Sequence, residues 1–280
     1  MSFAAALADA VRAHHSPLCV GVDPHGAALA RLGGDPVEQA RRFSLAVVAA
    51  AAGRVAVVKP QFAFFERLGP AGMGVLAEVC AEAGRRGLLV LGDAKRGDIG
   101  STAEAYADAT LTPGAPFPCH ALTVSPFLGP ESLAPFLAAA DRHGRGLFVL
   151  LRTSNPGSDR WQRPVADDVA AWLRREGERR LDPSGLSGLG AVVGATLGAE
   201  LGAWRAALPD TWLLLPGFGA QGAGVADVAR GLRPDGLGAL VVSARGATIP
   251  PPAEEPAWAA DPEAWVAARI EAVKSELAAG

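Results

Sequence analysis

Short runs of consecutive apolar residues recur along the chain, and segments with helical periodicity separate them. The apolar runs cover residues 18–22, 55–58, 88–93, 119–124, 147–151, 191–194, 212–215 and 239–242. Runs this short and continuously apolar are typical of parallel strands buried on both faces. Helical periodicity covers residues 3–14, 37–52, 71–85, 101–110, 130–141, 165–179 and 262–278. The pattern therefore predicts eight strands that alternate with helices over most of the chain.

Eight such strands with helices between them favour a closed parallel (β/α)8 barrel, the TIM-barrel fold, over the main alternative, an open doubly wound sheet. No Ser/Gly linker or charged run divides the 280 residues, so we expect a single barrel domain over residues 1–280. The amphipathic segment 3–14 is expected to cover the bottom of the barrel. The longest connection follows the fifth strand, contains a Gly/Ser/Pro loop at 182–190, and is a candidate for a mobile flap.

Each predicted strand ends on polar residues. In a barrel the C-terminal ends of all strands converge on one mouth, so residues far apart in the sequence become neighbours. The residues expected to meet there are Asp23, Lys59, Asp93, Lys95, Ser154, Gln221 and Arg245. Because nearly every charge directly follows an apolar strand, we favour an active site over a rim of solvated charges.

The densest cluster of charges lies in residues 93–102, with the sequence DAKRGDIGST. Period-2 alternation puts Asp93 and Lys95 on the same side of the third strand. Gly97 is expected to let the backbone turn, so that Asp98 projects from the loop. Two carboxylates then flank one ammonium group, an arrangement suited to proton transfer.

Ser101 and Glu104 have the spacing of a capping box, which predicts the start of the next helix. A purely structural alternative for the charged stretch is an ion pair together with a helix cap. In that alternative, Asp98 accepts hydrogen bonds from backbone N–H groups near Ser101.

The overall composition excludes several classes of partner. A net charge of −3 and a pI near 6.0 argue against nucleic-acid or anionic-membrane binding, although a local basic pocket for a phosphorylated small molecule remains compatible. The three cysteines, Cys19, Cys80 and Cys119, lie in apolar segments without metal-ligand spacing, as expected for buried thiols in a reducing cytosol. No secretion signal or membrane span is evident, so we expect a cytoplasmic protein.

A phosphate site is predicted at the ends of the last two strands. Gly217, Gly219 and Gly222 follow the seventh strand and Arg245 follows the eighth, where backbone N–H groups and a guanidinium commonly bind a phosphate dianion in barrels. Ordinary tight turns are the alternative explanation of the glycines. No dinucleotide fingerprint or Walker lysine is present, so nucleotide cofactors are not indicated.

A divalent metal is the other ligand to consider, because Asp23, Asp93 and Asp98 carry oxygen ligands. Lys59 and Lys95 are expected among them, and two ammonium groups would repel a divalent cation. We therefore expect a metal-free site in which carboxylates and ammonium groups alternate.

Residues 93–102 match the signature D-x-K-x-x-D-I-x-x-T, and with it the sequence resembles the orotidine 5′-phosphate decarboxylases, most closely their larger bacterial branch. Support comes from Lys59 in V-K-P, from the TSNPG sequence at 153–157 and from PGFGAQ at 216–221. Arg245 within SARG is a weaker match. The resemblance runs from about Cys19 to Arg245.

The resemblance implies an enzyme that converts orotidine 5′-phosphate to UMP and CO2, without metal or cofactor, as a homodimer. It assigns catalysis to Lys95, Asp93, Asp98 and Lys59. Lys95 would protonate the pyrimidine carbon that loses CO2, and Asp93 would lie against the departing carboxylate. The implied substrate-binding residues are Asp23, Thr102, Ser154, Pro216, Gly217, Gly219, Gln221, Arg245 and Gly246.

The same resemblance distributes these residues over the parts of the substrate. Asp23 and Lys59 would meet the ribose hydroxyls, and Ser154 would bind the pyrimidine edge. The phosphate would be held by Gln221 and Arg245. Asp98 and Thr102 would reach into the site of the partner subunit.

Two other functions are compatible with parts of the sequence. Magnesium-dependent sugar-phosphate lyases and decarboxylases share D-x-K-x-x-D, but they resemble each other in a Glu at the end of the second strand, where this chain has Lys59. A non-catalytic barrel that binds a phosphorylated metabolite is expected to have lost Lys95 or Asp93, and both are present. His120 stands where we expect an acidic residue in this branch, which leaves its role open.

Overall fold

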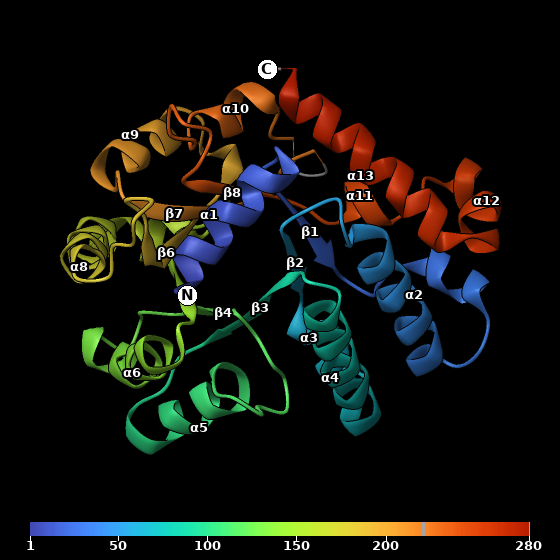
Figure 1. Ribbon diagram of the computed structural model, residues 1–280, viewed down its shortest axis with the longest axis horizontal. Coiled ribbons are helices and arrows are strands. Elements are labelled where there is room, and N and C mark those ends of the chain that lie inside the picture. Colours follow the sequence, from blue (N-terminus) through green and yellow to red (C-terminus); the bar gives the residue numbers. More distant parts are fainter. Residues whose placement is uncertain (220–221, 280) are drawn as a thin grey trace.

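Eight parallel strands close into a barrel in the computed structural model, which describes residues 1–219 and 222–279 (Figure 1). Each strand pairs with its sequence neighbours, and the last pairs with the first. The closed barrel confirms the predicted fold and excludes the open sheet. The strands are β1 (Leu18–Val22), β2 (Val57–Pro60), β3 (Leu89–Arg96), β4 (Ala121–Val124), β5 (Gly146–Arg152), β6 (Ser187–Val193), β7 (Thr211–Pro216) and β8 (Ala239–Ser243).

Helices surround the strands, and one further helix lies across them (Figure 1). The α-helices are α1 (Phe3–His14), α2 (Pro36–Ala51), α3 (Phe62–Glu66), α4 (Gly69–Arg85), α5 (Gly100–Leu111), α6 (Ala134–His143), α7 (Ser158–Trp161), α8 (Ala166–Glu178), α9 (Ala199–Ala207), α10 (Val225–Ala229), α11 (Arg245–Thr248), α12 (Glu255–Ala260) and α13 (Pro262–Ala278). Short 3-10 helices are η1 (Ala27–Leu32), η2 (Pro130–Leu133), η3 (Arg163–Val165), η4 (Ala195–Leu197) and η5 (Pro252–Glu254).

Helix α1 closes the N-terminal end of the barrel, as its amphipathic pattern predicted. Its buried face packs on side chains inside the barrel. The rings of Phe3 and Phe148 meet edge to face, with centroids 6.2 Å apart. A Cβ atom on Gly146, the first residue of β5, would lie 2.2 Å from the Phe3 ring, so only glycine leaves room for this contact. The opposite end of the barrel therefore remains for a site.

Regular structure occurs in one segment predicted as a loop and in a Pro-rich segment near the C-terminus. Strand β6 begins at Ser187, inside the predicted loop 182–190. Glycines interrupt its apolar pattern, and a Cβ on Gly190 would lie 2.6 Å from the Phe148 ring, so packing selects glycine there. The Pro-rich segment 249–256 contains η5 and the start of α12, which buries Trp258 against Phe43.

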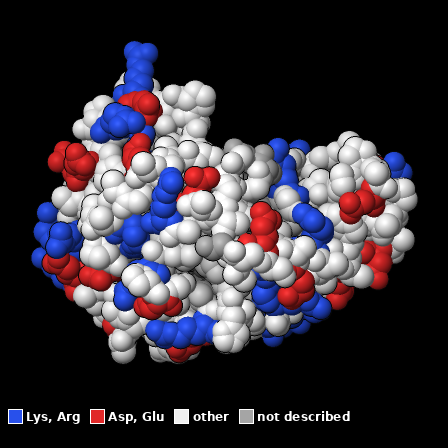
Figure 2. All heavy atoms as spheres, turned by 90° about the horizontal axis from the view of Figure 1, so that it is seen from above, with Lys and Arg blue, Asp and Glu red and all other residues white. Residues whose placement is uncertain are grey.

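The face of the molecule drawn in Figure 2 agrees with the charge balance of the sequence. Figure 2 shows acidic and basic side chains interspersed over one face, without a broad field of one sign. Within the part of the chain that the structure describes, no helix is both long and apolar enough to cross a bilayer.

Candidate active site

A buried ion pair joins the ends of β2 and β3. Lys59 Nζ lies 2.6 Å from Asp93 Oδ2, and the two side chains are 5% and 9% exposed. Burial lowers the pKa of Lys59, but the carboxylates of Asp93 and Asp23 outweigh it and raise the pKa above its ordinary value. Burial also raises the pKa of Asp93, but the ammonium groups of Lys59 and Lys95 hold it well below its usual range. Both members of the pair are therefore charged at neutral pH.

Asp93 is held by four donors. Oδ2 accepts from Lys59 and from Gln61 Nε2 at 3.0 Å. Oδ1 accepts from Lys95 Nζ and from Thr123 Oγ1 at 3.2 Å. Sequence reasoning does not select Gln61 or Thr123, because neither residue is charged and neither belongs to the matched signature. Together the donors fix the carboxylate in one orientation.

Lys95 reaches Asp93 through an unusual backbone conformation. Its φ is +49°, in the left-handed region that non-glycine residues rarely adopt. The hydroxyl of Thr123 accepts hydrogen bonds from the backbone N–H groups of Ala94 and Lys95, at 3.0 and 2.9 Å, and so stabilises the kink. Strand β3 also shifts register against β4 between Gly92 and Arg96. Asp93 and Lys95 thus face the same site, but a kinked strand rather than regular alternation brings them together.

Asp23 brings a second carboxylate to the site from the end of β1. Burial raises its pKa, while the nearby Lys59 lowers it in part. Its Oδ1 is buried and has no hydrogen-bond partner among the described residues. Because a buried acceptor without a donor is costly, this oxygen is suited to accept a hydrogen bond from a bound ligand.

The predicted strand-end residues line one cavity of about 250 Å³ at the C-terminal end of the barrel. From the predicted set the cavity contains Asp23, Lys59, Asp93, Lys95, Ser154, Pro216, Gly217 and Arg245. Residues that sequence reasoning did not select also line it, namely Gln61, Thr123, Thr153, Val192, Leu214, Phe218, Val242 and Ala244. None of these residues is charged, so the sequence does not mark them as site residues and only the closed barrel reveals them.

The end of the cavity near β7 and β8 is suited to an anion. Gly217 and Gly219 have φ values of 111° and 70°, conformations that favour glycine. Arg245 is the first residue of α11, and no carboxylate in the described ranges pairs with it. Gly219, Gly222 and Gly246 do not themselves line the cavity. The carbonyl of Gly246 accepts from Arg269 Nη2 of α13 at 3.1 Å. The predicted phosphate residue Gln221 lies outside the described residues.

Asp98 and Thr102 are absent from the lining of this cavity. The Oδ1 atom of Asp98 accepts a hydrogen bond from the backbone N–H of Ile99 at 2.9 Å, and Thr102 is exposed on α5. Within one chain, the structure therefore brings Lys59, Asp93 and Lys95 together but not these two residues.

The predicted capping box at the start of α5 is wrong. The helix begins at Gly100, its N-cap is Ile99, and no side chain caps it. The turn expected at Gly97 does not depend on a positive φ at that residue. The positive φ values in this loop belong to Lys95 and Gly100. A Cβ on Gly97 would lie 3.2 Å from the carbonyl oxygen of Ser125, so Gly97 permits a close approach of two loops.

His120 lies at the N-terminal end of the barrel, away from the cavity. Its Nδ1 accepts a hydrogen bond from the backbone N–H of Val90 at 3.0 Å, which links β3 to the residue before β4. Burial, assisted by the charge of Arg145, lowers the pKa of His120 to about 4. The imidazole is therefore neutral at pH 7 and has a structural role.

The fold and the cavity define a class of protein: a (β/α)8 barrel with a charged site at the C-terminal strand ends, as in barrel enzymes. The chain belongs to the orotidine 5′-phosphate decarboxylase / HUMPS family, whose sequence model matches residues 16–249.

Individual relatives agree with this assignment. An orotidine 5′-phosphate decarboxylase from Rhodopirellula baltica is 43% identical over 95% of this chain and 94% of its own. One from Deinococcus radiodurans is 45% identical over 87% and 88% of the two chains. The solved structure of Leishmania donovani OMP decarboxylase has a TM-score of 0.75 and 33% identity, and the match covers 100% of this chain and 98% of that one. The resemblance found in the motifs thus extends over nearly the whole chain.

Proposed function

We propose that this protein decarboxylates orotidine 5′-phosphate to UMP and CO2 in pyrimidine biosynthesis, without a metal or an organic cofactor. The observation that carries the proposal is Asp93, buried between the ammonium groups of Lys59 and Lys95 at the mouth of the barrel. The names of the relatives support the same reaction.

Lys95 is the proposed acid. When the bond between the pyrimidine ring and its carboxylate breaks, CO2 leaves and the electron pair stays on the ring carbon. That carbon then takes a proton from Lys95 Nζ, and the neutral amine regains a proton from solvent. An ammonium held at the developing carbanion stabilises the transition state electrostatically.

Asp93 is proposed to act on the carboxylate that departs. Two carboxylates about 4 Å apart repel each other by about 4 kcal/mol at an effective dielectric constant of 20. Asp93 cannot easily escape this repulsion by protonation, because Lys59 and Lys95 keep its pKa well below the usual range. Loss of CO2 relieves the repulsion.

The rest of the cavity is proposed to bind the nucleotide. Asp23 and Lys59 are assigned to the ribose hydroxyls. Both line the cavity, and Oδ1 of Asp23 has no hydrogen-bond partner among the described residues. Ser154 is assigned to the pyrimidine edge. Phosphate binding is assigned to Gln221 and Arg245, together with backbone N–H groups of Gly217, Gly219 and Gly222. Pro216 and Gly246 keep the general substrate-binding role that the resemblance implies. Contacts far from the reacting carbon can supply binding energy for closure over the base.

The direct test follows the loss of orotidine 5′-phosphate absorbance after purified protein is added in the presence of EDTA. We expect full activity under chelation, because Lys59 and Lys95 lie where a divalent ion would need ligands. Activity that disappears with EDTA and returns with magnesium would instead favour a metal-dependent lyase of the family. Binding of UMP without turnover would favour a non-catalytic barrel.

We further propose a homodimer in which Asp98 and Thr102 complete the partner's site. Both residues lie outside their own chain's cavity. Nearby loops expose large apolar side chains: Ile99 is 60% exposed, Phe127 77% and Leu128 48%. Exposed apolar side chains beside functional residues are typical of a surface covered by another chain. A two-fold dimer lets each loop reach across to the other mouth.

Mixing inactive variants tests the shared site. Lys95→Ala and Asp98→Ala proteins, each nearly inactive, are combined in equal amounts under conditions that exchange subunits. Random pairing makes about half of the dimers mixed, and if Asp98 acts in trans each mixed dimer has one intact site, so about a quarter of wild-type activity returns. If Asp98 serves its own chain, every site keeps a defect and mixing restores nothing. Native mass spectrometry of differently tagged chains confirms the exchange.

We also propose a cytoplasmic location. Cys19, Cys80 and Cys119 are free and buried, as is common for proteins of a reducing compartment.

A further inference from the structure

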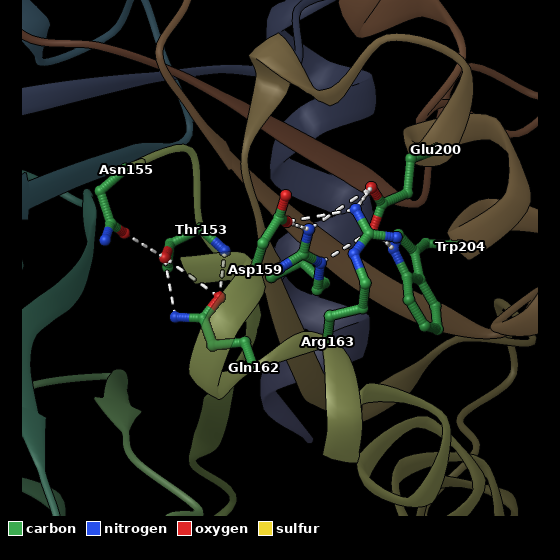
Figure 3. Close-up of polar contacts among 8 residues, drawn as sticks. Thr153, Asn155, Asp159, Gln162, Arg163, Glu200 and Trp204 are labelled. Carbon is green, nitrogen blue, oxygen red and sulfur yellow. Dashed lines mark hydrogen bonds and ion pairs between the residues drawn. The ribbon is translucent and has the colours of Figure 1, made fainter. Parts of the chain in front are cut away.

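A network of charged side chains lies beside the cavity, where β5 ends (Figure 3). Its central member is Arg152, the last residue of β5, whose side chain is only 1% exposed. Arg152 Nε donates to Glu200 of α9 at 2.8 Å, and Nη2 donates to Asp159 of α7 at 2.6 Å. Arg163 Nη2 contacts both Asp159 and Glu200, at 3.1 and 3.4 Å. The network thus contains two guanidinium groups and two carboxylates, whose charges balance.

A second set of contacts joins the same segment to the backbone of the strand end. Gln162 Oε1 accepts from the backbone N–H of Thr153 at 2.7 Å, and Gln162 Nε2 donates to Thr153 Oγ1 at 2.8 Å. The Thr153 hydroxyl also donates to Asn155 Oδ1 at 2.5 Å. Thr153 and Ser154 line the cavity. The network therefore ends directly at the site.

Apolar packing contributes little to holding residues 158–165 in place. Helix α7 buries only Ser158, and η3 buries no residue. Trp161 and Val165 are 65% and 48% exposed. The position of this segment must therefore depend on its polar contacts, which come from Asp159, Gln162 and Arg163.

The network has a buried half and an exposed half. Arg152 is buried, and Glu200 is 24% exposed and also accepts from Trp204 Nε1 at 3.1 Å. Asp159 and Arg163, which belong to the segment itself, are 64% and 58% exposed. Moving the segment away from the barrel would break only contacts made by its own side chains, while Arg152 and Glu200 remain paired.

We propose that Arg152, Asp159 and Glu200 are positioning residues that act as a latch for residues 158–165 and thereby hold Thr153 and Ser154 at the edge of the cavity. The expected effect of the latch on turnover rests on the proposed function. Its expected effect on the position of residues 158–165 does not. The pKa values agree with an ionised network, because hydrogen bonds to Arg152 lower the pKa values of Asp159 and Glu200.

The test compares Asp159→Asn with Asp167→Asn by hydrogen exchange of the ligand-free protein. Asp167 is an exposed acid in the first turn of α8 that makes none of these contacts, so its variant removes the same charge from the same connection. Loss of the ion pairs of Asp159, whose side chain is exposed, is expected to raise exchange in peptides covering 153–165 by about fivefold in Asp159→Asn. The control is expected to match the wild type.

Turnover gives the second readout. For Asp159→Asn we expect the KM for orotidine 5′-phosphate to rise by about fivefold, with kcat within about twofold and an unchanged melting temperature. Unchanged exchange at 153–165, or exchange that rises equally throughout the chain, would overturn the latch. If the wild type itself fails to decarboxylate, the proposed function fails, but the exchange experiment still decides the latch. Arg152→Met is expected to raise exchange in the same peptides. If Arg152→Met does not fold, Glu200→Gln is used in its place.

Discussion

Replacing Asp93 by asparagine tests both the electrostatics and the burial of the site. The amide has nearly the same shape and keeps one acceptor, but it removes the charge that Lys59 faces at 2.6 Å. Breaking a buried pair by removing one partner typically costs about 3–5 kcal/mol, because the remaining charge is left buried. We expect the lower end, about 3 kcal/mol, since the carboxylate of Asp23 also acts on Lys59.

Urea unfolding at one protein concentration measures this cost, and Asp23→Asn is the matched control. Burial raises the pKa of Asp23, and its Oδ1 finds no hydrogen-bond partner in the described part of the chain, so its charge contributes little to the stability of the folded state. The control is expected to change the free energy of unfolding by less than about 1 kcal/mol. If Asp93→Asn and the wild type have the same free energy of unfolding, the argument that the buried Lys59–Asp93 pair contributes to stability is refuted.

The pH dependence of this difference follows from the directions of the two pKa shifts. The pKa of Asp93 is lowered by folding, so its contribution is present above the unfolded value of about 3.9 and is lost as the pH falls further. The pKa of Lys59 is raised, so its contribution is present below about 10.4 and is lost as the pH rises through the folded value. The difference between wild type and Asp93→Asn should therefore be constant from about pH 5 to pH 9.

Three further predictions concern single side chains. The pKa of His120 is lowered to about 4, so stability should fall by up to about 3 kcal/mol as the pH drops from about 6.5 to 4, and urea unfolding of His120→Gln should lack this loss. Arg205→Met should destabilise the fold by about 3 kcal/mol, because the buried guanidinium donates to the carbonyls of Thr211 and Gly238 at 2.7 and 2.8 Å; an unchanged KM would show that the site is intact. Arg245→Ala should weaken UMP binding by about 1.5–3 kcal/mol, and calorimetry should show no change for uridine.

Much of the fold could be predicted because apolar runs and helical periodicity report burial directly. Short buried strands separated by helices leave few architectures, and the barrel then brings Lys59, Asp93 and Lys95 together although Lys59 is distant in sequence. The predicted start of strand β6 at residue 191 lies after the observed start at Ser187, because the sequence alone does not show that Gly190 is selected by its close approach to Phe148. The local sequence pattern carries no information about contacts between residues that are distant in the chain.

The support around the site could not be predicted for the same reason. Thr123 and Gln61 are ordinary polar residues until the closed barrel places their side chains against Asp93. The capping box at Ser101 failed because the chain enters α5 from a loop shaped by tertiary contacts, which override a local sequence preference. Arg152 belonged to a predicted strand end, but its partners lie on two other elements.

The left-handed backbone of Lys95 has a consequence for how this position can change over evolution. A residue with a side chain costs about 1–2 kcal/mol more than glycine in this region of φ/ψ space. Considering the backbone alone, drift at this position would therefore run toward glycine or asparagine, and only selection for activity opposes it. Without that selection, replacement of Lys95 by glycine would remove the catalytic ammonium and also lower the conformational energy of the backbone. Loss of function at this position would therefore be easier than its recovery.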